Sequence, residues 1–172
     1  MVSIFNEWVR KDVGKVFVQL FETTLANWLG EDPGLCLFRK YCGNALIMEQ
    51  NGDVYACDHF VFPDYFRGNI IDDPLLDLAL SPEQISFGFH KYNGLPSMCR
   101  SCEYLFACHG ECPKNRISTT PEGEYGLNYL YPGFKHYFSH AAPFMDHMAE
   151  QIRNSKSPLS VKRYARKLLP SR

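Results

Sequence analysis

Seven cysteines at fixed spacings are the residues of this sequence best suited to chemistry. They fall into two groups, Cys36, Cys42 and Cys57 first, and then the run Cys99-x2-Cys102-x5-Cys108-x3-Cys112. A Cys-x2-Cys pair closes a small chelate ring at little entropic cost, and spacings of two and three residues are hard to obtain from core packing. The pattern therefore predicts thiolate ligands of a metal rather than seven thiols buried in a core.

The division of the seven thiols distinguishes iron from zinc. The order Cys-x2-Cys followed by Cys-x3-Cys-Pro is similar to the bacterial ferredoxin run, in which the fourth cysteine serves the other cluster. By that logic Cys112 completes a four-thiolate site with the first group, and Cys99, Cys102 and Cys108 form a second site with one ligand fewer. Zinc would instead take the four cysteines of the second run and leave the first three unused. We favour iron-sulfur clusters, with zinc as the alternative.

Length and composition describe an ordinary globular chain. Of its 172 residues 45% are hydrophobic and 22% charged, which excludes disorder and coiled coil. No apolar run approaches the roughly 20 residues of a membrane span, and the charged N-terminus is unlike a signal peptide. We therefore expect a cytoplasmic protein without a membrane partner, in which close cysteines bind metal more often than they form disulfides. No basic stripe accompanies the aromatic residues, so we expect no nucleic-acid partner.

Local signals around the first cysteine group predict short elements. Residues 3–11 have a helical apolar face, and Val16–Leu20 is typical of a short buried strand, so together they predict one helix-strand unit. Asn51-Gly52 between two apolar runs predicts a β-hairpin that ends at Cys57. Pro74 is expected to begin a short helix.

The second half of the chain combines helices with an irregular segment. Ser81 is a predicted N-cap, with proline at the first helical position and the helix running to about His90. Residues 93–131 lack periodicity, and so long an irregular stretch indicates that something other than a core orders it, such as bound metal. An apolar stripe from Phe134 to Ile152 predicts a helix that is broken or bent at Pro143.

The C-terminal end is basic. Val161, Tyr164 and Leu168 recur at helical spacing among Lys and Arg side chains. This pattern predicts an amphipathic helix whose basic face is solvated or lies on the more acidic remainder of the chain.

The cysteine pattern and the words around it resemble a known family. Cys42-x9-Gly52-x4-Cys57, followed by the second cysteine run, is similar to the SPASM module, a C-terminal extension of radical S-adenosylmethionine enzymes that usually carries two auxiliary 4Fe-4S clusters. The words GDVYACDHF at 52–60, GNI at 68–70 and GECPKNR at 110–116 resemble anaerobic sulfatase-maturating enzymes, which oxidise a cysteine or serine of a sulfatase to formylglycine. The resemblance extends from Trp8 to about Ile152.

The resemblance implies roles for individual residues. The first cluster would be held by Cys36, Cys42, Cys57 and Cys112, and the second by Cys99, Cys102 and Cys108. Asp58 matches the aspartate proposed in the family to act as general base on the substrate side chain, a role that suits a carboxylate beside a cluster.

The chain departs from the family pattern at two points. It has no Cys-x3-Cys-x2-Cys motif for the radical cluster, since Asn115 stands where Cys108-x3-Cys112 would need a third cysteine. S-adenosylmethionine would therefore be bound only in a full-length parent enzyme, and this chain alone is not expected to be active. Tyr131 stands where the last cysteine of the family is expected, which leaves the fourth iron of the second cluster open, water-bound or held by a phenolate and makes that cluster more labile.

These observations give an expected architecture. The fold class is α+β: a small irregular SPASM-type metal-binding domain with a β-hairpin, short helices and a C-terminal helix, preceded by one helix-strand unit of a truncated (β/α) barrel. The expected divisions are 1–30 for the end of the barrel and a linker helix, 31–152 for the SPASM domain and 153–172 for a basic helix and tail.

The expected function follows from that architecture. The chain would be the iron-sulfur domain of a sulfatase-maturating oxidoreductase, with a sulfatase peptide as substrate of the parent enzyme and an electron-transfer partner. The alternative is a standalone zinc or iron-sulfur module that serves protein interaction.

Overall fold

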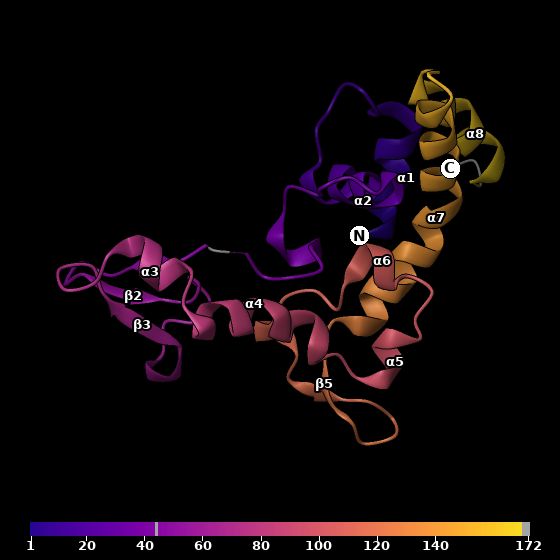
Figure 1. Ribbon diagram of the computed structural model, residues 1–172. Coiled ribbons are helices and arrows are strands. Elements are labelled where there is room, and N and C mark those ends of the chain that lie inside the picture. The colour runs from indigo at the N-terminus through magenta and orange to yellow at the C-terminus, as the bar shows by residue number, and fades with distance from the viewer. Residues whose placement is uncertain (44, 170–172) are drawn as a thin grey trace.

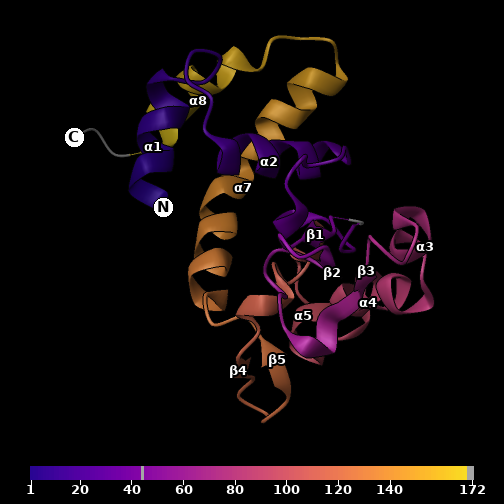
Figure 2. The same cartoon turned by 90° about the vertical axis from the view of Figure 1, so that its left-hand side faces the viewer.

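Four helices bury the main hydrophobic core. In this computed structural model, which describes residues 1–43 and 45–169, they are α1 (Val2–Lys11), α2 (Gln19–Leu29), α7 (Tyr131–Arg153) and α8 (Val161–Leu168). The core is strongly aromatic: the ring of Phe5 lies 5.2 Å from that of Phe21 and 5.7 Å from that of Phe144. Helices α1 and α8 lie side by side against α7 (Figure 1 and Figure 2), so distant parts of the sequence share one core.

A three-stranded antiparallel sheet forms an arm beside this helical core. Its strands are β1 (Ile47–Met48), β2 (Asp53–Tyr55) and β3 (Phe66–Asn69), in the order β1-β2-β3 with Ile47 opposite Tyr55. Two helices accompany the sheet, α3 (Leu75–Ala79) and α4 (Pro82–Asn93). Figure 1 shows the sheet at the end of α4 far from the helical core.

Short elements connect the arm to α7. Helices α5 (Ser97–Arg100) and α6 (Leu105–Cys108) are followed by a small hairpin of β4 (Ser118–Thr119) and β5 (Tyr125–Leu127). Single 3₁₀ turns occur at Cys36–Phe38, Pro63–Tyr65, Pro113–Asn115 and Pro158–Ser160. The segment 93–131 is thus mostly irregular, as its sequence predicts.

The turn and cap predictions are confirmed. Asn51-Gly52 lies in the turn between β1 and β2, with Gly52 at φ 88°, a conformation that favours glycine. The Ser81 hydroxyl accepts a 3.2 Å hydrogen bond from the backbone N–H of Gln84, and Pro82 is the first residue of α4. The short helix expected after Pro74 is α3.

The C-terminal predictions are confirmed in part. The predicted apolar stripe, with Phe138 and Met145, is buried on α7, but the helix runs without a break through Pro143 to Arg153. A basic amphipathic α8 exists, although Ala165 rather than Leu168 completes its buried face. None of the described helices is long and apolar enough to cross a membrane.

The predicted strand Val16–Leu20 is wrong. The segment after α1 is irregular, Val16 and Phe17 are 50% and 74% exposed, and Gln19 already begins α2. A strand needs a neighbour for its hydrogen bonds; in the part of the chain that is described, no strand pairs with this segment, and the carbonyl of Val16 instead accepts from the indole N–H of Trp8. The mixed helix-and-sheet class is confirmed, whereas the described residues contain neither a helix-strand unit nor a closed barrel.

Truncating Phe5 tests the aromatic core. Phe5→Ala is expected to lower the free energy of unfolding by about 3–5 kcal/mol, because the fully buried ring leaves a cavity among aromatic neighbours. Phe17→Ala is the matched control, since that ring is 74% exposed and its removal should change stability by less than about 0.5 kcal/mol. Urea unfolding of both variants measures the difference, and equal losses would contradict the proposed core.

Candidate metal centre

The seven cysteines line two separate hollows. The first hollow is lined by Cys36, Cys42, Cys57 and Cys112. The second hollow is lined by Cys99, Cys102 and Cys108. The structure therefore places Cys112 with the first group, as the iron-sulfur partition expects, and not with the other cysteines of its own run.

Backbone contacts bring the first group together from four segments. Cys36 begins a 3₁₀ turn, and Cys57 lies two residues after the end of β2. The N–H of Cys42 donates to the carbonyl of Gly88 in α4 at 3.1 Å, and a Cβ on Gly88 would lie 2.8 Å from the carbonyl oxygen of Cys42. The glycine is therefore required for α4 to approach the cysteine segment so closely.

The second group sits on two short helical turns that face α7. The N–H of Cys102 bonds the carbonyl of Cys99 at 3.2 Å, and Cys108 ends α6. The opposite wall is built from α7 by Phe134 and Phe138. Helix α7 thus connects the helical core to this hollow, which explains why the aromatic stripe continues to its N-terminal end.

A left-handed turn sends Cys108 and Cys112 to different hollows. His109, Gly110 and Glu111 have φ values of 46°, 70° and 56°, two of them in non-glycine residues for which this region is unfavourable. The turn directs three successive carbonyls at the guanidinium of Arg116. The hydrogen bonds from the buried Arg116 side chain therefore stabilise the unfavourable backbone conformation of this turn.

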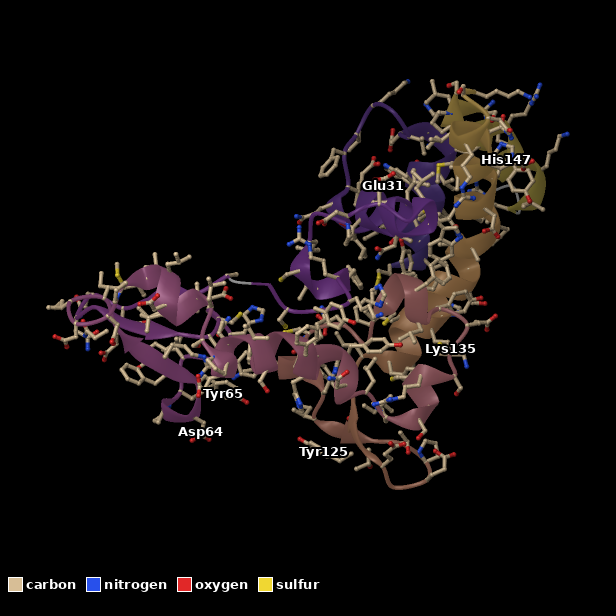
Figure 3. The ribbon with its side chains drawn as sticks, in the orientation of Figure 1. Glu31, Asp64, Tyr65, Tyr125, Lys135 and His147 are labelled. Atoms are coloured by element: carbon tan, nitrogen blue, oxygen red, sulfur yellow. The ribbon has the colours of Figure 1, made fainter. Side chains whose placement is uncertain are left out.

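Tyr131, where the family's last cysteine is expected, does line the second hollow. It is the first residue of α7 and packs against the small buried cluster of Leu95, Cys99 and Leu127. Lys135, one turn later and labelled in Figure 3, lines the same hollow with its ammonium 5.8 Å from the centre of the Tyr131 ring. A hydrogen bond to Tyr131 raises the pKa of Lys135. The position thus offers a phenol with a cation beside it instead of a thiol.

Burial disfavours the thiolate form of five of the cysteines in the absence of metal. Desolvation raises the pKa of Cys57 and of Cys108 to about 12, and it also raises the pKa values of Cys42, Cys99 and Cys112. Thiolates at such positions need a positive charge that replaces the lost hydration, which a bound metal provides. The donor set is therefore suited to a soft metal.

The thiols surround a space rather than a point. Among the described residues, no three His, Cys, Asp or Glu side chains converge as they would on one ion. One zinc ion draws its four thiolates to about 2.3 Å, whereas the thiolates of a cluster bind different irons and stand further apart. Two hollows that are each lined by several thiols, without convergence on one point, fit multinuclear clusters.

Asp58 and His59 lie at the edge of the first hollow. The Asp58 side chain is 68% exposed and accepts a 3.0 Å hydrogen bond from the Cys57 thiol, which lowers the pKa of this carboxyl. Nδ1 of His59 lies 3.3 Å from the sulfur of Cys112, the position of a hydrogen-bond partner to that sulfur. His109, the other histidine next to a cysteine, lines neither hollow within the described chain.

Sequence reasoning missed the charged residues buried between the hollows. Lys91 is 1% exposed and lines the first hollow, Arg116 is 7% exposed, and Glu111 is 3% exposed. Lys91 occurs on a helix rich in polar residues, where nothing in its spacing distinguishes it from a solvated side chain. Glu111 and Arg116 do fall within the word GECPKNR, which was the only available signal.

Comparison with known proteins defines the class of this site. The SPASM family, described as an iron-sulfur cluster-binding domain, matches residues 36–103. The chain is 53% identical over 161 residues to the serine-type anaerobic sulfatase-maturating enzyme of Bacteroides thetaiotaomicron, covering 94% of this chain and 39% of that protein. It is 31% identical over 140 residues to the serine-type enzyme of Klebsiella pneumoniae, with coverage of 81% and 33%. The chain thus spans about two-fifths of the length of the curated relatives it matches.

Solved structures agree in fold. Native anSMEcpe with bound AdoMet and Cp18Cys peptide superimposes with a TM-score of 0.75 at 25% identity, over 88% of this chain and 42% of that one. Polyhistidine-tagged anSMEcpe with bound AdoMet gives a TM-score of 0.74 at 24% identity, over 96% and 42%. The site is therefore that of a SPASM iron-sulfur cluster-binding domain. Beyond the residues of the SPASM match, nearly the whole chain is similar to part of the anaerobic sulfatase-maturating enzymes.

Proposed function

We propose that the chain holds two 4Fe-4S clusters in an enzyme that oxidises a sulfatase side chain to formylglycine. The observation that carries this proposal is the division of seven thiols between two hollows. When bound, the clusters would act as one-electron carriers. Because the relative at 53% identity is a serine-type enzyme while a cysteine-type relative from Clostridium novyi is 24% identical, we infer that the oxidised group is a serine.

Asp58 is the group we propose as general base. Its carboxylate is exposed and ionised, so a substrate hydroxyl can reach it. In the structure it accepts a hydrogen bond from the Cys57 thiol. Once Cys57 becomes a thiolate ligand, that proton is gone and the oxygen is free to accept one from the substrate.

The division of labour along the chain is also a proposal. Residues 31–152 form the cluster-bearing unit, 1–30 continue from a radical-generating barrel, and 153–172 are a basic helix and tail, whose residues 170–172 lie outside the described part. The exposed Val16 and Phe17 support this, since they are apolar surface that a barrel would cover. Radical chemistry with S-adenosylmethionine and the contact with an electron-transfer partner belong to the longer, cytoplasmic enzyme.

Separate removal of each cysteine set tests the presence of two clusters. The chain loaded anaerobically with iron and sulfide is expected to hold about eight iron atoms, and Cys42→Ala and Cys102→Ala about four each, since each variant disables one hollow. Iron and sulfide analysis with visible absorbance measures this. Stoichiometric zinc in a colourless protein, or loss of all iron in either variant, would contradict two independent clusters.

Restoring a cysteine at Tyr131 tests the incomplete ligand set of the second hollow. We expect Tyr131→Cys to slow the bleaching of the second cluster in air several-fold, because a fourth thiolate closes its open iron. Tyr129→Cys, at a position 51% exposed, is the matched control for an added thiol. An equal bleaching rate in Tyr131→Cys and the unmodified chain would show that the ligand set is already complete.

Replacing Asp58 tests the proposed base. In a longer protein that includes the radical-generating part, Asp58→Asn should slow serine oxidation about 10²–10⁴-fold and leave cleavage of S-adenosylmethionine intact, because only the proton acceptor is lost. Asp64→Asn, also exposed, serves as the control. Both reactions are followed by mass spectrometry of a sulfatase peptide and of the cleavage product. Wild-type oxidation by Asp58→Asn would remove Asp58 from the reaction.

A further inference from the structure

Two cations are buried between the hollows without a carboxylate partner. Lys91 is 1% exposed, and its ammonium donates to the carbonyls of Cys36 at 2.5 Å and Leu37 at 2.9 Å. Arg116, 7% exposed, donates four hydrogen bonds, all to backbone carbonyls. Neither side chain forms an ion pair with any of the described residues. Burial of an unpaired charge costs several kcal/mol, and an anion bound beside such a cation offsets part of that cost.

The two cations are linked to each other and to both hollows. Nη1 of Arg116 donates to the carbonyl of Lys91 at 2.6 Å, and its Nε to the carbonyl of Gly110, which lines the second hollow. Lys91 itself lines the first hollow, together with Cys36, Cys42, Cys57 and Cys112.

One buried carboxylate lies nearby, but it does not neutralise them. Glu111 accepts hydrogen bonds from the side-chain amides of Asn115 and Asn128, at 2.8 and 2.6 Å. Two buried cations against one buried carboxylate leave a positive excess of one charge in this region.

A four-thiolate 4Fe-4S cluster has the opposite charge. It is a dianion when oxidised and a trianion when reduced, so a fixed cation beside it favours the reduced form. We propose that Lys91 is the buried counter-cation of the cluster in the first hollow and raises its reduction potential, with Arg116 holding Lys91 in place through its carbonyl. This inference rests on the iron-sulfur assignment above. The step concerned is the addition of one electron, with no bond made or broken.

The test is a redox titration of the loaded chain. In the Cys102→Ala background, where only the first cluster is expected, dithionite supplies the electron through mediator dyes and the reduced cluster is counted by electron paramagnetic resonance. Lys91→Met should lower the equilibrium constant for one-electron reduction ~10–100-fold. Each tenfold change corresponds to about 59 mV. Lys91→Arg, which keeps the charge, should restore the value to within about threefold of the parent chain. Lys156→Met, at an exposed lysine, is the control for charge removal elsewhere.

Each outcome decides the proposal. An unchanged potential in loaded Lys91→Met overturns it, since a merely structural lysine would leave the potential unmoved. If Lys91→Met takes up no iron, Lys91→Gln is titrated in its place. Iron uptake by Lys91→Arg but by neither neutral variant supports a required charge, whereas loss of uptake in all three shows a packing role and overturns it. If the unmodified chain itself takes up no iron, the cluster assignment has failed. Iron analysis of that chain detects this failure before any variant is titrated.

Discussion

The arrangement of both hollows depends on the hydrogen bonds between the Arg116 guanidinium and four backbone carbonyls. Three of these carbonyls belong to the left-handed turn at residues 109–111, whose conformation is unfavourable without such support. The turn separates Cys108 from Cys112 and so allots them to different hollows. The fourth carbonyl, of Lys91, ties α4 to the same point. One planar cation thus fixes the relative position of two thiol sets.

The structure divides into a part that packs by itself and a part that lacks a core of that kind. The helices α1, α2, α7 and α8 share a large aromatic core. At the second hollow, Phe134 and Phe138 belong to that core, and the separate buried apolar cluster comprises Leu95, Cys99 and Leu127 among the described residues. The cysteine segments are held mainly by turn hydrogen bonds and by buried charges. Since metal binding contributes directly to folding where a core is small, the cluster is the natural source of order in these segments.

The elements that the sequence predicts correctly are those specified within a few residues. The Asn51-Gly52 turn needs φ above zero, and the Ser81 cap bonds a backbone N–H three residues away, so both can be read locally. The strand at Val16–Leu20 failed because β-structure depends on a partner that the described chain does not provide. The prediction that Leu168 lies on the buried face of α8 was wrong for a similar reason, because the elements packed against α8 decide which of its residues are buried.

The grouping of the cysteines could be predicted, but the charges around them could not. Spacing assigns Cys112 to the first group because ligand runs follow a chemical pattern. Lys91 reaches its hollow only through the approach of α4 at Gly88, a contact 46 residues away from Cys42 that no spacing encodes. A buried lysine is costly, so composition predicts it to be solvated. Its burial beside thiols becomes reasonable when the charge of a bound cluster is counted, and with Lys91 acting as proposed above, the fold would contribute to the reduction potential of that cluster together with its ligands.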